Sequence, residues 1–322
     1  MVKLTLRSLR LLPVLLVVLA LLAGSPVLAA DRGLTVGGPG GPILMANVSP
    51  GQTLTHTMTV SIGTDFQATE ITVRIGDFGQ SLSGVYELLE PAGNSSLSAC
   101  PFITLDKESF HLEPGGSEVV TATIRVPQDV GTGGRYALIN IRTGVTGEGG
   151  VGMIVAVNVP IFLTVKDTTL NRQGEISELG IGVAGEQSLN ISTIFHNTGN
   201  YHFKVKGEIT INRFKGKTLD NIALPLTSVS LIPGMSLQLQ ANYSPEEALP
   251  EGIYIVKSRV MLEDDTVLAE KRAAFEVTET GIVTLPEVPD EGTPINRVML
   301  GGIIGGVVAV GLIIFFLVKR RT

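Results

Sequence analysis

Apolar and polar residues alternate with a period of two along much of this 322-residue chain. In the clearest run, threonine and serine separate the apolar-face residues Leu54, His56, Met58, Val60 and Ile62. Successive side chains of a strand point to opposite faces, so the run predicts a strand with one face on a core. Similar patterns predict strands near residues 71–75, 120–126, 137–141, 151–165, 189–195, 203–205, 209–211, 237–243, 254–256 and 273–277.

The two halves of the chain repeat each other. Leu112-Glu-Pro-Gly-Gly-Ser117 matches Leu231-Ile-Pro-Gly-Met-Ser236, and Gly134-Arg-Tyr136 matches Gly252-Ile-Tyr254, at offsets of 119 and 118 residues. Each half therefore has a Pro-Gly turn and a tyrosine near the start of a later strand, where a sandwich domain can use it to anchor a corner. The sequence predicts an all-β fold of two tandem immunoglobulin-like β-sandwich domains, 31–167 and 168–279, and then a single transmembrane helix.

The N-terminus has the features of a secretory signal peptide. Basic residues, an apolar stretch and small residues follow in order, at Lys3, Arg7, Arg10, 11–22 and 25–30. This order predicts cleavage after Ala29 or Ala30 and a signal peptide over residues 1–30. An uncleaved membrane anchor is the alternative, and the short apolar stretch favours cleavage.

The C-terminus predicts a membrane anchor. Residues 298–318 carry no charge, and 21 helical residues at about 1.5 Å each span a hydrocarbon core of about 30 Å. We expect an extended linker over 280–296, a transmembrane helix over 297–318 and a basic cytoplasmic tail over 319–322, with the bulk of the chain outside the cell. A glycolipid-anchor signal and a sortase signal are alternatives. The basic end opposes the first, and Val288-Pro289 in place of Thr-Gly opposes the second.

The predicted membrane helix carries two overlapping Gly-x-x-x-Gly pairs, Gly301 with Gly305 and Gly302 with Gly306. Such pairs let two helices approach closely. They suggest a homo-oligomer formed through the helix, although glycine is common in membrane helices.

Composition and charge narrow the classes of partner. The 24 Lys and Arg residues include three in the signal peptide and three in the tail, which leaves 18 against 30 acidic residues and a net charge of −12 between them. An acidic ectodomain opposes nucleic-acid binding. The lone Cys100 excludes an internal disulfide, which in an exported sandwich favours a bacterial or archaeal source.

No residue constellation predicts catalysis, a cofactor or a metal site. His56 lies on the apolar face of its strand and is interpreted as a core histidine, while His196 and His202 flank an Asn-Thr-Gly-Asn turn. Glu263-Asp264-Asp265 is interpreted as a solvated hairpin loop, with cation binding as the alternative. The glycine clusters lack the helix and the Lys-Ser/Thr pair of a phosphate loop.

Tyr86 and Tyr201 are the best candidates for partner contact, because the chain lacks tryptophan and has five tyrosines, two of them interpreted as structural. Stacking of a glycan on these rings is one hypothesis. Protein recognition through a sheet edge or loop tip is favoured over it.

The Pro-Gly turns, Gly134-Arg-Tyr136, His196-Asn-Thr-Gly-Asn200, Gly252-Ile-Tyr254 and the membrane helix with its basic tail together resemble the bacterial WxL-interacting protein family. Gly84-Val-Tyr86 also lies where that family has a glycine-to-tyrosine segment, whereas Ser61-Ile-Gly-Thr64 departs from its pattern. The resemblance implies a peptidoglycan-binding first domain and a host-binding second domain.

These observations predict a non-enzymatic cell-surface binding or scaffold protein. Its expected partners are surface or secreted proteins, with cell-wall polymer as a further partner. One alternative is a membrane-anchored export or assembly chaperone that presents a sheet edge to client strands. The other is a hydrolase with an unrecognised carboxylate site.

Overall fold

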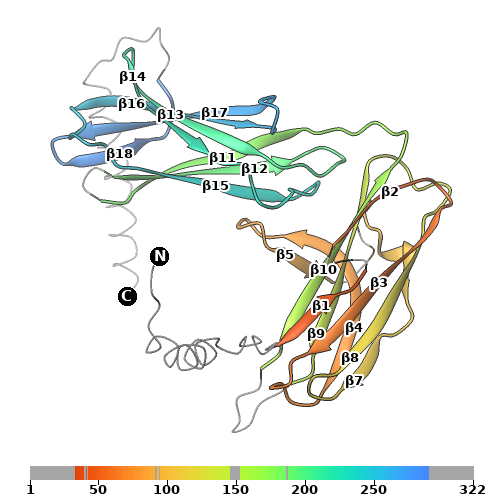
Figure 1. Cartoon of the computed structure of the whole chain (residues 1–322). Coiled ribbons are helices and arrows are strands. Elements are labelled where there is room, and N and C mark those ends of the chain that lie inside the picture. Colours follow the sequence, from red (N-terminus) through yellow and green to blue (C-terminus); the bar gives the residue numbers. More distant parts are fainter. Residues whose placement is uncertain are drawn as a thin grey trace, which may run out of the picture. The chain divides into compact units, whose positions relative to one another are not determined.

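The computed structural model in Figure 1 describes residues 33–39, 41, 43–90, 93, 95–145, 153–185 and 188–289. The predicted signal peptide, membrane helix and basic tail lie outside these residues, as do Gly301, Gly302, Gly305 and Gly306. In the described ranges, no helix has the length and hydropathy of a membrane span.

The described chain is all-β, as predicted, and divides into two compact units. The first unit contains the residues up to Gln173 together with Asn197–His202 and Leu231–Met235. The second contains Gly174–His196, Phe203–Ser230 and the residues from Ser236 onward. A boundary between residues 167 and 168 would assign the two short segments to the second domain, whereas their backbones pack within the first unit.

The first unit is a sandwich of two sheets, with the strand orders β1-β3-β8-β6 and β2-β10-β9-β4-β5, and with β7 also paired to β4. The initial strand is split, so that β1 pairs antiparallel with β3 in one sheet and β2 pairs parallel with β10 in the other. This is the strand order of an immunoglobulin-like sandwich. The strands are β1 (Leu34–Gly37), β2 (Leu44–Val48), β3 (Thr53–Ile62), β4 (Thr69–Gln80), β5 (Tyr86–Leu89), β6 (Ile103–Leu105), β7 (Ser109–Leu112), β8 (Ser117–Arg125), β9 (Gly134–Thr143) and β10 (Ala156–Val165), with a short 3-10 helix at Cys100–Phe102.

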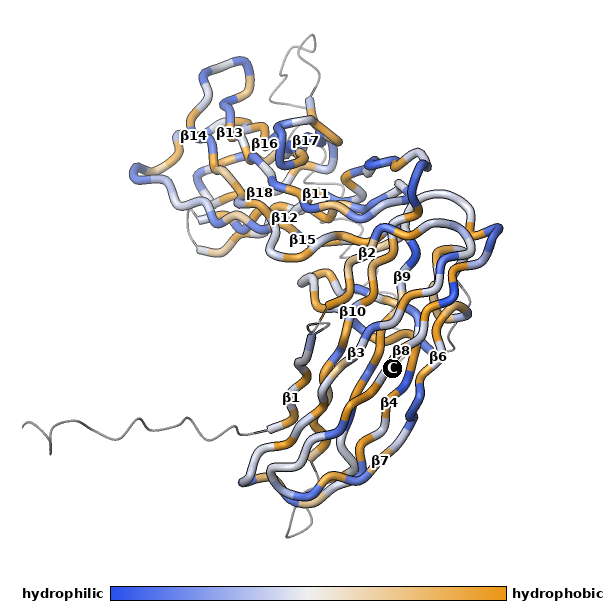
Figure 2. Tube along the Cα trace, turned by 45° about the vertical axis from the view of Figure 1, so that its right-hand side comes forward, coloured by the Kyte–Doolittle hydropathy of each residue, from blue (hydrophilic) through white to orange (hydrophobic). Residues whose placement is uncertain are grey.

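Alternate residues of the central strands form the core of this unit. Met58, Val120, Ile139 and Val159 come from four strands, and none of them is exposed to solvent. Figure 2 shows the alternation of apolar and polar residues along β3 and β8. Each large apolar side chain buried in this way stabilises the fold by about 1.5 to 3 kcal/mol.

His56 lies in this core, as predicted, with 2% of its surface exposed. Burial lowers the pKa of its imidazole, which opposes protonation. Its Nε2 atom has no hydrogen-bond partner in the described part of the chain. The side chain is therefore a core histidine that is not fully satisfied.

The second unit is a sandwich of a three-stranded sheet, β11-β12-β15, and a five-stranded sheet, β14-β13-β16-β17-β18. Buried side chains between the sheets include Phe195, Ile209, Tyr254 and Phe275. The strands are β11 (Gly174–Val183), β12 (Leu189–Asn197), β13 (Lys206–Arg213), β14 (Thr218–Leu224), β15 (Ser236–Tyr243), β16 (Gly252–Met261), β17 (Val267–Thr278) and β18 (Gly281–Leu285).

The long alternating segments of the sequence form strands, whereas two predicted segments differ in detail. The run at 151–165 becomes a strand only from Ala156 onward. Residues 203–205 precede β13, although Phe203 and Val205 are buried. Glu263-Asp264-Asp265 lies in the loop between β16 and β17, where Lys206 pairs with Asp265 at 2.7 Å.

The predicted linker over 280–296 is wrong at its start. Gly281–Leu285 forms β18, which pairs antiparallel with β17 and therefore belongs to the second unit. Two conditions favour this strand: Ile282, Val283 and Thr284 have high β-propensity, and Gly281 adopts a φ of 132° after the turn. An extended linker can begin no earlier than Pro286.

The repeated tyrosines have different partners. Tyr254 donates a hydrogen bond from its hydroxyl to the carbonyl of Pro250 at 2.5 Å, which is the predicted corner. The hydroxyl of Tyr136 lies 3.2 Å from Nδ1 of His202 instead of bonding nearby backbone. The corner bond therefore forms at Tyr254 alone, while Tyr136 is buried in a core cluster of the first unit, which agrees with its predicted structural role.

We expect Tyr254→Phe to lower the free energy of unfolding of the second unit by about 1 kcal/mol, because it removes the corner hydrogen bond. Urea unfolding followed by circular dichroism measures the change. Tyr243→Phe is the matched control, since the Tyr243 side chain is buried but its hydroxyl has no bond in the described chain. Equal losses in the two variants would contradict a specific role for the corner.

Candidate protein-binding site

The candidate site begins where β4 leaves its sheet. Residues up to Gly76 pair with β9, and Asp77–Gln80 pair with β5 instead. Glycines permit this close return: a Cβ at Gly76 would lie 2.4 Å from a Leu88 methyl, and one at Gly79 would lie 2.8 Å from Leu89 Cγ. Side chains at either position would push β5 away.

A loop takes the position beside β9 that β4 vacates. The N–H of Tyr136 donates to the carbonyl of Leu97 at 2.9 Å, and the N–H of Ala99 donates to the carbonyl of Tyr136 at 2.7 Å. Ser98 and Tyr136 form an isolated parallel bridge. The backbone of β9 is thereby satisfied although β4 has turned away.

Asp77 fixes this loop from the bend in β4. Its carboxylate is 5% exposed and accepts hydrogen bonds from the Ser98 hydroxyl, from the Ser95 N–H at 3.4 Å and from the Cys100 thiol at 3.4 Å. Burial, with a smaller contribution from the neighbouring Asp77 carboxylate, raises the pKa of the Cys100 thiol to about 11. Cys100 is therefore a protonated structural thiol at neutral pH, unsuited to nucleophilic attack.

An aromatic cluster packs beside the bend. The Phe78 ring centroid lies 4.7 Å from that of Tyr86 and 5.2 Å from that of Phe162, and Phe162 lies 4.8 Å from His202. Tyr201 continues the series with its centroid 4.2 Å from that of His202. Edge-to-face and tilted contacts of this kind stabilise a packed cluster.

Burial sets the protonation of the polar members of this cluster. It lowers the pKa of His202 to about 4 and raises the pKa of the Tyr136 phenol. Both groups are therefore neutral at pH 7, and the imidazole Nδ1 can accept a hydrogen bond from the Tyr136 hydroxyl.

The second repeat of the Pro-Gly turn also belongs to the first unit. Asn197 holds this turn by donating from Nδ2 to the carbonyl of Leu231 at 2.9 Å and accepting from the N–H of Gly234 at 2.8 Å. Gln80 accepts from the N–H of Ile232 at 3.2 Å. Gly234 has a φ of 77°, as the turn requires.

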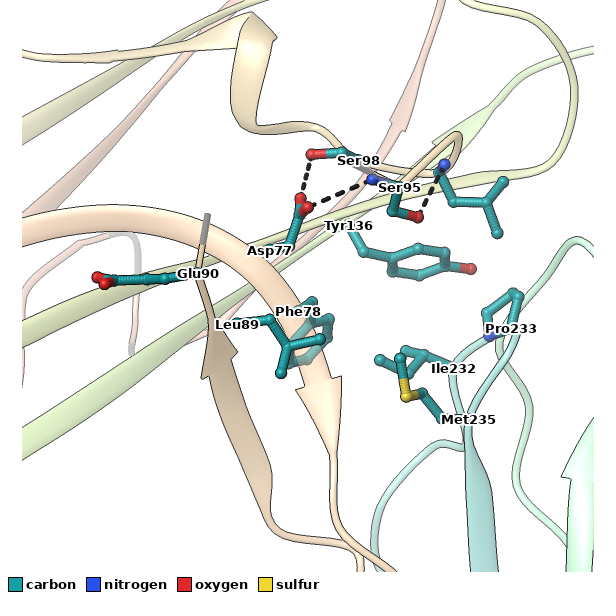
Figure 3. Close-up of a pocket in the computed structure, with 11 residues that line it drawn as sticks. Asp77, Phe78, Leu89, Glu90, Ser95, Ser98, Tyr136, Ile232, Pro233 and Met235 are labelled. Atoms are coloured by element: carbon teal, nitrogen blue, oxygen red, sulfur yellow. Dashed lines mark hydrogen bonds between the residues drawn. The ribbon is translucent and has the colours of Figure 1, made fainter. Parts of the chain in front are cut away.

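These elements surround a half-open pocket of about 410 Å³, drawn in Figure 3. The figure shows Tyr136 and Phe78 on one side and Ile232, Pro233 and Met235 on the other, with Asp77, Ser95 and Ser98 bonded together at the edge. The lining is mostly apolar with a few polar groups, which suits an inserted side chain. It is made of Asp77, Phe78, Leu89, Glu90, Ser95, Leu97, Ser98, Tyr136, Ile232, Pro233 and Met235.

The structure brings the two predicted contact residues into one cluster. Tyr86 and Tyr201 are both half-buried, and they lie at opposite ends of the series of rings through Phe162 and His202. Their role in partner binding stays a prediction. His196, on the other side of the Asn-Thr-Gly-Asn turn from His202, forms a hydrogen bond of 3.1 Å between its Nδ1 and the Ser236 hydroxyl.

Sequence reasoning missed Asp77 and the Ile232–Met235 side of the pocket. Asp77 continues the alternate positions that Val73 and Ile75 fill with apolar side chains, and this is the signal that could have found it. Nothing local in the sequence links it to Ser98. Among the described residues, no group of three or more His, Cys, Asp or Glu side chains could hold a metal ion.

No protein-family model and no curated protein sequence matches this chain. Solved structures with weak overall similarity include a chaperone and tip adhesin complex of CFA/I fimbriae biogenesis, at 10% identity and a TM-score of 0.36, covering 80% of this chain and 100% of that one. The E. coli chaperone DraB has 13% identity and a TM-score of 0.33, with 75% and 98% covered. The Salmonella enterica SafA pilin in complex with the SafB chaperone has 10% identity and a TM-score of 0.32, with 75% and 95% covered. Similarities this weak assign no function to this chain, and its fold is assigned from the strand order described above.

We expect the first unit to lose stability as the pH falls from about 6.5 to about 4. The folded pKa of His202 is about 4, below its value of about 6.5 when unfolded, so the unfolded chain binds the proton first. Between pH 7.5 and 5.0 the loss from this group is about 2 kcal/mol. Urea unfolding of the wild type and His202→Gln measures it, because other titrating groups are common to both. Parallel pH curves for the two proteins would contradict the assignment.

We expect Asp77→Asn to expose Cys100 to thiol reagents. The change removes the nearby negative charge and weakens the hydrogen bonds that hold the loop. At pH 8 the rate of Cys100 modification should therefore rise at least about tenfold. Reaction with Ellman's reagent measures the rate. Glu90→Gln, a change at an exposed carboxylate of the same pocket, is the matched control and should leave the rate unchanged. Equal rates in both variants would contradict the role given to Asp77.

Proposed function

We propose that this chain is a non-enzymatic, membrane-anchored protein of the extracytoplasmic surface that binds surface or secreted proteins and takes part in their assembly. The immunoglobulin-like sandwich supports a binding role, since such domains present edges and loops to partners. The buried, protonated Cys100 and the neutral His202 oppose nucleophilic and acid-base roles at these residues. The anchor and the signal peptide are the predicted segments 297–318 and 1–30.

The observation that carries this proposal is an unpaired sheet edge in the second unit. β15 is an eight-residue strand that pairs with β12 throughout, and no described segment pairs with its other side. It contains no charged residue, no proline and no register shift. Proteins usually protect long edges with such features, so a bare edge is a template for a strand of another chain.

The other edges of this unit are protected. On β11, Lys271 donates to the carbonyls of Ile176 and Ser177, and Thr284 donates to that of Ile181. β14 carries Asp220 and faces a register shift in β13, and β18 has five residues. The contrast favours assembly through strand pairing over the scaffold function.

The scaffold function is the second candidate, and the pocket of the first unit favours it. Apolar walls and bonded polar groups could hold a side chain of a folded partner, and the Tyr86 ring packs against the lining residue Phe78. Membership of the WxL-interacting family is a further proposal. It would make surface proteins the partners in either function and cell-wall polymer a ligand of the first unit.

Capture experiments test the function and separate the two candidates. We expect the purified full chain in detergent to retain secreted or surface proteins of its own cell, preferentially before they have folded. Leu89→Glu adds a charge to the pocket at a 42% exposed position and should leave this capture unchanged. Loss of capture in this variant would favour the scaffold function. Retention of wall polymer alone would contradict protein binding.

A further inference from the structure

We infer that the open edge of β15 binds an extended segment of a partner protein, antiparallel to β15, with apolar residues opposite Ala241 and Tyr243 and a polar residue opposite Asn242. The inference rests on the proposed function and names the chemistry of the partner. The bound segment belongs to another protein, and a dimer formed through this edge would instead indicate a second copy of this chain.

The internal repeat gives β15 a counterpart in the first unit. β8 begins at Ser117 and β15 begins at Ser236, 119 residues later, and each follows a Pro-Gly turn of the repeat. In both turns the glycine has a positive φ, 74° at Gly115 and 77° at Gly234. β8 pairs with β3 on one side and β6 on the other. β15 pairs with β12 on the side that corresponds to β3, so within the described residues the position of β6 is vacant.

Alternate residues of β15 form backbone hydrogen bonds with β12, and this alternation shows which backbone groups point to the vacant side. The N–H of Asn197 donates to the carbonyl of Met235, at the continuation of the β12 and β15 pairing. In an antiparallel ladder these bonds recur at every second residue, so Leu237, Leu239, Ala241 and Tyr243 point their backbone groups toward β12. Residues 236, 238, 240 and 242 point theirs toward the open edge.

The side chains along this edge leave it accessible. Gln240 and Asn242 are exposed, and the side chains of Gln238, Gln240 and Asn242 make no hydrogen bond within the described chain. The inward side chains Leu237, Leu239, Ala241 and Tyr243 belong to the core of the unit. An added strand would extend that core on one face and meet uncharged amides on the other.

The strand β6 indicates what the vacant position accepts. Ile103, Thr104 and Leu105 lie opposite Ile124, Thr123 and Ala122 of β8 in an antiparallel pairing. Adding 119 to the numbers of the three β8 residues gives Tyr243, Asn242 and Ala241. Ile103 is buried, Thr104 is exposed and Leu105 is half-buried. The partner therefore needs the same alternation of apolar and polar residues.

The charge near the edge restricts the partner further. Asp220 on β14 acts on Tyr243, where its negative charge adds to the effect of burial in raising the pKa of the phenol. β14 also supplies an apolar side chain to this side of the core, because Leu224 and Leu239 both approach Gly207. An acidic residue opposite Tyr243 would be repelled, whereas an apolar one would find contacts.

Peptide binding to the full chain in detergent tests the inference. The probe is a fluorescent peptide of eight alternating isoleucine and threonine residues, flanked by lysines for solubility, and anisotropy measures its affinity. A peptide with the isoleucines grouped together and a peptide with glutamate in place of one isoleucine are the controls. We expect the alternating peptide to bind at least about tenfold more tightly than either. Equal affinities would overturn the inference.

A matched pair of variants locates the binding. Gln240→Pro removes the N–H that points to the open edge while the ladder with β12 stays intact, whereas Gln240→Ala keeps this N–H. We expect the first to weaken peptide binding about tenfold and the second to change it less than about twofold. Circular dichroism shows whether Gln240→Pro folds. If it does not, Gln240→Lys replaces it, because a lysine on the edge opposes strand addition without altering the backbone.

The outcomes separate this inference from the proposed function. If a folded Gln240→Pro variant binds the peptide like the wild type, or still captures its protein partners, the edge assignment is overturned and the protein-binding function stands. If sedimentation shows a dimer that Gln240→Pro dissociates and the peptide does not bind, the occupant is a second copy and the inference is overturned. If the chain captures no proteins at all, the proposed function itself fails.

Discussion

The backbone N–H and C=O groups of every strand need hydrogen-bond partners, and the two units satisfy this requirement in different ways. Where β4 turns away from β9 at Gly76, the loop through Leu97 and Ala99 supplies bonds to Tyr136. Where β8 would have an open side, the short strand β6 covers part of it. In each place a nearby segment completes the ladder, as buried polar groups demand.

The second unit meets the same requirement differently. Its repeat of β8 is β15, and the described residues place no strand at the position of β6. Solvent can hydrate an exposed edge, so the unit is stable without a further strand. β15 also has no charged residue, proline or register shift that would oppose the addition of a strand from another chain. Stability and the capacity for binding are therefore compatible at this edge.

The sequence predicted most of the long strands but less of the site. Alternation located β3, β8 and β15, because one side of each strand is buried and the other faces solvent. Short strands such as β6 and β18 contain too few residues for a periodic signal. The bond between Asp77 and Ser98 joins residues 21 positions apart, and local pattern carries no information about such a pairing. The vacancy beside β15 was also invisible, since a paired strand and an edge strand can show the same alternation.

Pairing between the open edge of β15 and a strand of a captured protein can be measured directly. Hydrogen–deuterium exchange of the full chain, free and in complex with a protein it has captured, tests this most directly. We expect the amides of Gln238, Gln240 and Asn242 to exchange rapidly in the free chain and to become protected in the complex. Unchanged exchange at these three amides in a fully formed complex would contradict it.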